Sequence, residues 1–139
     1  MLLKAQQVMQ LHVTIDPGLK VGQTLRGKLN VIPITGGTVT GKVSGHVISG
    51  GADWNTEIEP GLSHVFAKYV IQTDDGEFIS VENEGTIRWE EKRNIVTVPR
   101  FLVNKESRYH WLQSGVFVGA LQGSEGDPTA VLITIYQLS

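Results

Sequence analysis

A short string in the first half of the chain, Gly50-Gly51-Ala52-Asp53-Trp54, places a carboxylate and an indole directly after two glycines. The glycines permit backbone angles that a Cβ atom would forbid, so we expect a sharp corner after the preceding strand. Asp53 beside an apolar wall would have a raised pKa, which suits a general acid or base. A structural interpretation also fits, in which Asp53 caps backbone amides and Trp54 plugs the end of the fold.

Four further side chains have the chemistry of a ligand pocket. Tyr69 is expected to orient a substrate oxygen, and as a buried tyrosine it needs a hydrogen-bond partner such as Asp53 or Asn83. Tyr109 and Trp111 share one face of an expected strand and would form a flat wall for a small planar ligand, with core packing as the alternative for Trp111. We therefore predict two catalytic residues, Asp53 and Tyr69, and four ligand-binding residues, Trp54, Asn83, Tyr109 and Trp111.

Other kinds of reactive site have weaker support. The chain has no cysteine, and its four histidines, His12, His46, His64 and His110, stand in no metal-ligand spacing such as His-x-His. We therefore expect no metal and no cofactor. A serine elbow needs Gly-x-Ser-x-Gly, and Ser49 lacks the first glycine. The carboxylates of Asp74 and Asp75 fall in an expected turn, where successive side chains point apart into solvent.

The elements that must position these residues are almost entirely strands. Sixteen glycines and five prolines separate short runs rich in Val, Ile, Thr, Tyr and Phe. The expected strands are Met9–Ile15, Thr24–Ile34, Thr38–Ile48, Leu62–Thr73, Phe78–Asn83, Arg108–Leu121 and Thr129–Leu138, with turns at Asp16-Pro17-Gly18, Asp74-Asp75-Gly76 and Gly126-Asp127-Pro128. The best helical candidate, Arg88–Asn94, is too short to bury a face.

Strands joined by short turns in a chain of 139 residues predict one domain, either a sandwich or a barrel. Glycines inside the strands favour the barrel, because closure of a sheet needs bends. These glycines are Gly27, Gly41, Gly45, Gly115 and Gly119. The sequence therefore predicts an all-β protein, a single antiparallel β-barrel over residues 1–139 with little or no helix.

Charge and hydropathy argue against several classes of partner. The net charge is −2, from 12 basic and 14 acidic residues, whereas a nucleic-acid-binding face needs clustered Lys and Arg. The nearest basic group, Arg88, Lys92 and Arg93, is interrupted by Glu90 and Glu91, so we expect a solvated loop and no nucleic-acid partner. No segment approaches the roughly 18 apolar residues of a membrane helix. No signal peptide is recognisable either, so we expect a cytoplasmic protein with no membrane partner.

Several of these motifs occur together in one family. The chain carries, in order, Pro33-Ile34-Thr35-Gly36-Gly37, the Gly50 to Trp54 string, Thr73-Asp74-Asp75-Gly76, Arg108-Tyr109-x-Trp111-Leu112 and Val116-Phe117-Val118-Gly119. With these motifs the sequence resembles the DUF3237 family, also called UPF0311, from about Gly22 to Tyr136. The resemblance implies a calycin-like or lipocalin-like β-barrel and implies no particular reaction. The residues that the resemblance best supports as site residues are Asp53, Trp54, Tyr69, Asn83, Tyr109 and Trp111.

The chain also departs from the family pattern at polar positions. Many members carry an acidic residue where Ala67 stands, and an acid followed by threonine where Leu102 and Val103 stand. Gln113 replaces an asparagine of the pattern. Because those polar groups are missing here, a binding pocket is favoured over an active site.

Three functions remain open from the sequence. The first is a barrel that binds a small apolar or aromatic ligand. The second is a cofactor-free isomerase, cyclase or lyase that acts on a small carbonyl or polyketide-like compound, with Asp53 as acid or base. The third is a structural or interaction module, in which exposed β-branched strands such as Val131–Ile135 pair by their edges or by their faces in a homodimer.

Overall fold

The computed structural model describes residues 1–91, 95–124 and 126–139. Strands make up 71% of it and helices 5%, so the all-β prediction is confirmed. The strands are β1 (Ala5–Ile15), β2 (Leu19–Thr24), β3 (Gly27–Gly41), β4 (Gly45–Val47), β5 (Gly51–Glu59), β6 (Leu62–Thr73), β7 (Phe78–Arg88), β8 (Val96–Leu102), β9 (Val116–Ser124) and β10 (Asp127–Leu138). Two short helical turns, η1 (Trp89–Glu91) and α1 (Trp111–Ser114), accompany them.

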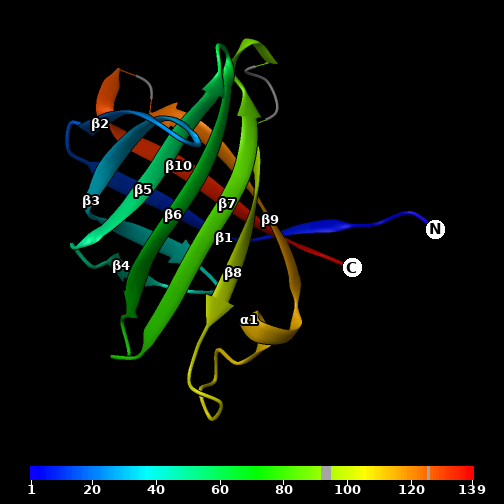
Figure 1. The fold of residues 1–139 in the computed structure, drawn as a ribbon. Coiled ribbons are helices and arrows are strands. Elements are labelled where there is room, and N and C mark those ends of the chain that lie inside the picture. The colour runs from blue at the N-terminus through cyan, green and yellow to red at the C-terminus, as the bar shows by residue number, and fades with distance from the viewer. Residues whose placement is uncertain (92–94, 125) are drawn as a thin grey trace.

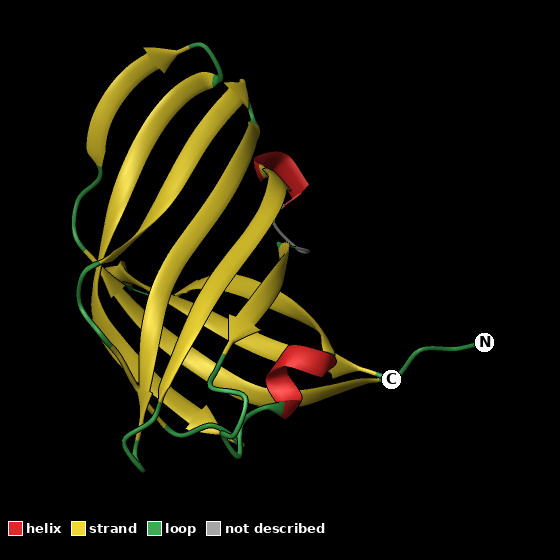
Figure 2. Cartoon of the chain, turned by 60° about the horizontal axis from the view of Figure 1, so that its bottom comes forward, coloured by secondary structure: helices red, strands yellow, loops and turns green. Residues whose placement is uncertain are grey.

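Eight strands close into an antiparallel barrel (Figures 1 and 2). Strands β5 to β10 pair in sequence order, and β1 then joins β10 on one side to β3 on the other. Met9 shows this closure, because it stands opposite both Ile135 in β10 and Gly41 in β3. Strand β2 extends the sheet beside β3, and β4 bridges β3 and β6. The prediction of a closed barrel is confirmed.

The two ends of the barrel differ. We call the end with the β6–β7 turn and α1 the packed end, at the bottom of Figure 1, and the end with the β5–β6 turn and η1 the open end, at its top. Inward side chains fill the packed end with an apolar core that includes Val39, Val47, Ile71, Ile79, Phe101, Leu112 and Phe117. Toward the open end, polar and small residues share the inward positions, and the interior is not filled.

The predicted corner at Gly50 and Gly51 exists, but it leads directly into a strand. Gly50 has a φ of +118° and turns the chain from β4 into β5. A Cβ atom on Gly51 would lie 2.6 Å from the Tyr69 Cβ and 2.5 Å from the Lys68 carbonyl oxygen, so only glycine fits there. Asp53 therefore lies within β5 and not on the corner, where the sequence had suggested it.

Strands β2, β5 and β8 were not predicted from the sequence. In β8, Pro99 obscured the pattern, because proline lacks the N–H that a paired strand uses. The outward residues Val96, Val98 and Leu102 are apolar and about half to two-thirds exposed, which hides the alternation further. The inward positions of β8 are nevertheless regular, since Thr97, Pro99 and Phe101 are all buried.

The strand predicted over Arg108–Leu121 is wrong in its first half. Residues Trp111–Ser114 form α1, and the strand begins only at Val116. Tyr109 and Leu112 are three residues apart, so a helical turn points both into the core, where each is 2% exposed. The strand face that Tyr109 and Trp111 were expected to share does not exist.

Strand β10 is not a free edge. Val131–Ile135 pairs with β1 on one side and with β9 on the other. Ile133 and Ile135 are buried in the core. Because both backbone edges of this segment are occupied, a homodimer cannot form by edge pairing through it.

Residues 92–94, within the segment predicted to be a solvated loop, lie outside the described residues. Within the described part of the chain, no helix has the length and apolar character needed to cross a membrane.

We expect Gly51→Ala to destabilise the protein by about 1–3 kcal/mol, because the added methyl group would force β5 away from Tyr69. Equilibrium unfolding in urea measures the change. Gly123→Ala is the control, since nothing lies within 4 Å of a Cβ at that position. The control should stay within about 0.5 kcal/mol of the wild type. Equal losses in the two variants would contradict the explanation by close packing.

Candidate functional site

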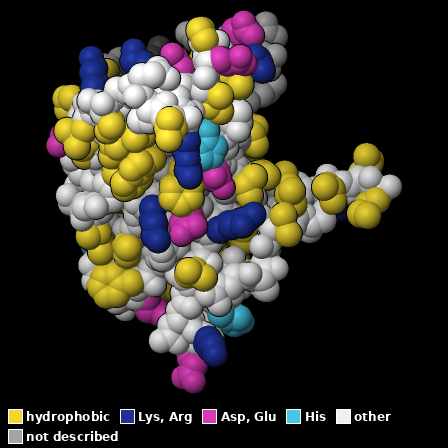
Figure 3. All heavy atoms as spheres, in the orientation of Figure 1, with side chains coloured by type: hydrophobic (Ala, Val, Ile, Leu, Met, Phe, Trp, Pro, Cys, Tyr) yellow, Lys and Arg dark blue, Asp and Glu magenta, His cyan; other side chains and the backbone are white. Residues whose placement is uncertain are grey.

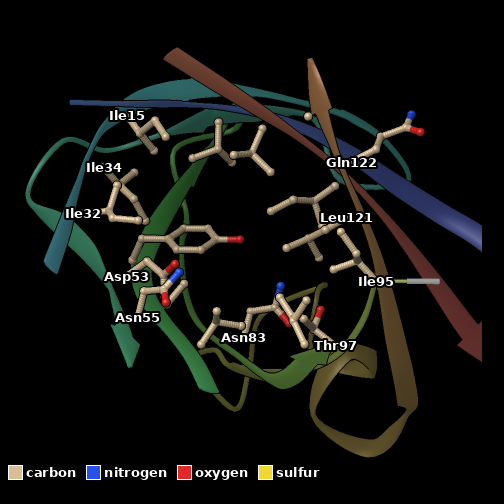
Figure 4. Close-up of a pocket in the computed structure, with 18 of the residues that line it drawn as sticks. Ile15, Ile32, Ile34, Asp53, Asn55, Asn83, Ile95, Thr97, Leu121 and Gln122 are labelled. Carbon is tan, nitrogen blue, oxygen red and sulfur yellow. The ribbon is translucent and has the colours of Figure 1, made fainter. Parts of the chain in front are cut away.

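The open end of the barrel encloses a cavity of about 260 Å³, which Figure 4 shows from one side. Most of its wall is aliphatic, formed by Val13, Ile15, Ile32, Ile34, Val65, Ile87, Ile95, Leu121, Val131 and Ile133. The remaining lining includes the polar residues Asp53, Asn55, Tyr69, Asn83, Thr97 and Gln122. An apolar wall with few polar groups is the usual composition of a small-molecule site.

Small residues keep this space open. Ala67 contributes only a methyl group to the wall. Gly123 contributes no side chain, and nothing lies within 4 Å of where its Cβ would stand. The strands that carry the surrounding aliphatic residues are held by pairing on both sides, so the wall cannot collapse inward to fill the gap.

Asp53 enters the cavity from β5, directly opposite Ala67 on β6. Its Oδ1 accepts a hydrogen bond from the Phe66 backbone N–H at 3.1 Å. Burial raises the pKa of Asp53, and the Phe66 N–H and the nearby His64 only partly oppose that rise. The carboxyl thus caps one amide, as the structural interpretation expected, and also faces the cavity, as the functional interpretation expected.

Tyr69 lines the same cavity from β6 and is 3% exposed. Burial raises the pKa of its hydroxyl, so the group stays protonated at neutral pH. In the described part of the chain, the suggested hydrogen bond from Tyr69 to Asp53 or Asn83 is not formed. A tyrosine hydroxyl inside an apolar cavity is therefore available to a ligand oxygen.

Asn83 and Thr97 form a polar part of the wall on β7 and β8. They are 3% and 1% exposed, and neither Asn83 Oδ1 nor Thr97 Oγ1 has a hydrogen-bond partner among the described residues. Both lie against Gly119, because a Cβ there would be 2.7 Å from Thr97 Oγ1 and 3.7 Å from Asn83 Nδ2. Sequence reasoning missed Thr97 because it missed the strand that carries it.

Trp54 does not reach the cavity. It follows Asp53 in a strand, where successive side chains point to opposite faces, so the indole lies on the outside and is 45% exposed. There it lines a shallow groove with Leu29, Ile58 and Phe66. Figure 3 shows hydrophobic side chains gathered on this face over β3 and β5, beside charged side chains over β6 and β7.

Tyr109 and Trp111 also lie away from the cavity, at the packed end. The Tyr109 hydroxyl donates to Asp75 at 2.8 Å, and Arg108 Nε donates to the same carboxylate at 2.7 Å. Hydrogen bonds from Thr73, Arg108 and Tyr109 hold the pKa of Asp75 well below its usual range. Trp111 packs on Phe117 with ring centroids 6.0 Å apart. Asp75 therefore joins the β6–β7 turn to the segment before α1, and these residues close the barrel.

Among the described residues, no group of three or more His, Asp or Glu side chains is arranged to hold a metal ion. The structure thus brings together Asp53, Tyr69 and Asn83 from the predicted set, adds Asn55 and Thr97, and separates Trp54, Tyr109 and Trp111 from them.

A closed antiparallel barrel, packed at one end and hollow at the other, defines a calyx-like β-barrel protein. The family described as "Protein of unknown function (DUF3237)" matches residues 3–138, and the chain belongs to this family. The resemblance seen in the sequence motifs is confirmed.

Relatives and solved structures agree with this assignment. A UPF0311 protein of Bradyrhizobium diazoefficiens is 36% identical over 134 residues, covering 85% of this chain and 87% of the relative. The crystal structure of a conserved protein of unknown function from Rhodopseudomonas palustris is 30% identical with a TM-score of 0.87, covering 100% of this chain and 99% of that one. A beta-barrel like protein from Acinetobacter baumannii, 26% identical, also has a TM-score of 0.87, covering 100% of this chain and 98% of that one.

Asp53→Asn is expected to stabilise the protein at pH 7. Because burial raises the pKa of Asp53 in the folded state, the ionised carboxyl opposes folding once the pH exceeds that raised value. Asparagine removes the charge and keeps an oxygen for the Phe66 N–H. Melting curves should show the variant above the wild type at pH 7, with the gap closing as the pH falls from the raised value toward the ordinary value of 3.8.

The exposed Asp16 supplies the control, because Asp16→Asn removes the same charge without touching the cavity. A variant at Asp53 that melts below the wild type at pH 7 would contradict the assignment of a destabilising buried carboxyl.

Proposed function

We propose that this protein binds a small, mostly apolar organic molecule inside the cavity of the barrel. The observation that supports it most is the combination of a mostly aliphatic wall with a few inward polar groups at Asp53, Tyr69 and Asn83. Ligand sites in β-barrels occur at the mouth of the barrel and bury most of the ligand surface. The apolar wall would supply affinity, and the polar groups would fix the orientation of the ligand.

The volume limits the size of the ligand. A cavity of about 150 Å³ in another protein holds one benzene ring. The space of about 260 Å³ found here suits a compound of one substituted ring or two fused rings. Larger ligands would have to project through the open end.

Filling the cavity tests this function. Gly123→Leu adds a side chain where nothing lies within 4 Å, so it should fold normally and occupy the ligand space. A panel of indole, coumarin and 2-naphthol is measured by thermal shift and calorimetry. A ligand at about 100 times its Kd stabilises the folded state by about 2.7 kcal/mol. We expect such stabilisation in the wild type and its loss in Gly123→Leu.

Thr56→Leu is the matched control, because Thr56 lines the outer groove and not the cavity. It should bind like the wild type. Binding that survives in Gly123→Leu but is lost in Thr56→Leu would move the site to the outer groove and refute the proposal.

Cofactor-free catalysis by Asp53 is a second candidate function. The observation that favours it is a partly buried carboxyl with a raised pKa in the same cavity as the Tyr69 hydroxyl. Asp53 would remove a proton from the carbon next to a ligand carbonyl, while Tyr69 donates a hydrogen bond to the enolate oxygen. The same carboxyl would return the proton to another carbon, so an isomerisation is balanced without any cofactor.

Proton exchange tests this chemistry directly. We expect the protein to accelerate exchange of the hydrogens next to the carbonyl of 1-tetralone in D₂O, followed by NMR. Asp53→Asn should lower the catalysed rate by about 10²–10⁴-fold, the usual contribution of a general base. Tyr69→Phe should lower it less. An unchanged rate in Asp53→Asn, with tetralone still bound, would leave binding as the function and exclude this catalysis.

A further inference from the structure

The ionisable groups of the cavity show which ligand charge it can accept. Among the described residues that line it, none is Lys, Arg or His, and the one carboxyl is Asp53. An anionic ligand would lose its hydration, lie near the Asp53 carboxyl and find no cationic side chain in the cavity wall to pair with. An uncharged ligand avoids that cost. An ammonium ligand could pair with Asp53, but its own charge would also have to be removed from water, which costs free energy.

The buried polar residues of the protein divide into two groups. Ser63, Thr73 and Ser107 are buried and hydrogen-bonded, to Trp89, to Glu77 and to the Tyr109 backbone respectively. In contrast, Asn83 and Thr97 are buried with Oδ1 and Oγ1 unpaired in the described part of the chain. A third unpaired oxygen, Asn30 Oδ1, lies beside Gly18 and outside the cavity.

The position and chemistry of Asn83 and Thr97 indicate which kind of ligand group could supply their missing hydrogen bonds. They sit side by side in Figure 4, on adjacent strands and both against Gly119. An amide and a hydroxyl each offer a donor and an acceptor, and neither carries charge. Asn83 Oδ1 accepts only, so its missing partner is a donor. A ligand hydroxyl can accept from the amide and also donate, whereas a carbonyl or an ether oxygen cannot donate.

We propose that the cavity selects uncharged ring compounds that carry a hydroxyl group, and that the Asn83 amide, with Thr97 beside it, holds that hydroxyl. This inference rests on the proposed binding function and specifies its ligand. The ring of the ligand packs against the aliphatic wall. Its hydroxyl group forms hydrogen bonds with Asn83 and Thr97, which a hydrocarbon cannot form. Asn83 and Thr97 are thereby specificity-determining residues.

Four probes of one ring system test this selection: naphthalene, 2-naphthol, 2-naphthoate and the cation of 2-naphthylmethylamine. Dissociation constants for the unaltered protein are measured by calorimetry at pH 7. We expect 2-naphthol to bind at least about tenfold more tightly than naphthalene, because naphthalene lacks the missing donor. We expect 2-naphthoate to bind at least about a hundredfold more weakly than 2-naphthol. The cation should also bind more weakly than 2-naphthol.

Two variants assign the preference to residues. Thr97→Val keeps the shape and removes the unpaired hydroxyl, so the unliganded protein should melt no lower than the wild type. The same variant should reduce the preference for 2-naphthol over naphthalene several-fold. Asn83→Leu should reduce that preference to about threefold or less. Thr56→Val, on the outer groove, is the matched control and should change neither property.

The outcomes separate the two proposals. Equal affinity for naphthalene and 2-naphthol would leave the binding function intact and overturn the hydroxyl selection. Tighter binding of 2-naphthoate or of the cation would overturn the selection for uncharged ligands. Failure of every probe to bind would overturn both proposals. A Thr97→Val variant that loses stability and keeps the full preference would assign Thr97 a purely structural role.

Discussion

Closure of the sheet by the pairing of β1 with β3 is the constraint on which the rest of the structure depends. Once every strand of the barrel has a partner on both sides, alternation directs every second side chain into one shared interior. Asp53, Asn83 and Thr97 come from different strands and meet there for this reason alone. An open sheet with the same strands would leave these groups in water, and the raised pKa of Asp53 would disappear with its burial.

The hollow half of the barrel depends on the packed half. The apolar core around Ile71, Leu112 and Phe117 fills one end, and Asp75 ties the β6–β7 turn to Arg108 and Tyr109 across it. The same strands continue from this end to the cavity, so their spacing is set where the packing is dense. The open end, whose side chains leave a space between them, can therefore keep its shape although it is not filled.

The sequence predicted the class of fold more fully than the site. Alternation, turn residues and glycines were enough for an all-β barrel, because these signals are local and repeated along the chain. The site depends on register, which is not local. The string from Gly50 to Trp54 stands out in the sequence, but nothing local shows that it enters a strand. The sequence therefore predicts one pocket for Asp53 and Trp54, whereas their side chains point to opposite faces of β5.

The two remaining errors at the site have equally specific causes. Tyr109 and Trp111 alternate like strand residues, and only the burial of Leu112 three positions after Tyr109 distinguishes a helical turn from a strand. Thr97 was missed because β8 carries a proline and apolar outward residues. In each case tertiary packing decides where the side chain lies, and the local sequence pattern does not distinguish a strand from other structure.

The cavity gathers groups that oppose folding in one place. Its partly buried carboxyl, Asp53, has a raised pKa. The amide oxygen of Asn83 and the hydroxyl oxygen of Thr97 have no partners in the described chain, whereas Ser63, Thr73 and Ser107 elsewhere are paired. Ala67 and Gly123 leave the adjoining space empty, although larger apolar residues there would strengthen the core. If stability alone had shaped this barrel, valine or leucine would satisfy all of these positions better. A mostly apolar ring compound whose hydroxyl group pairs with Asn83 and Thr97 would remove part of this conflict. The unfavourable features therefore argue for a ligand more strongly than the shape of the cavity does.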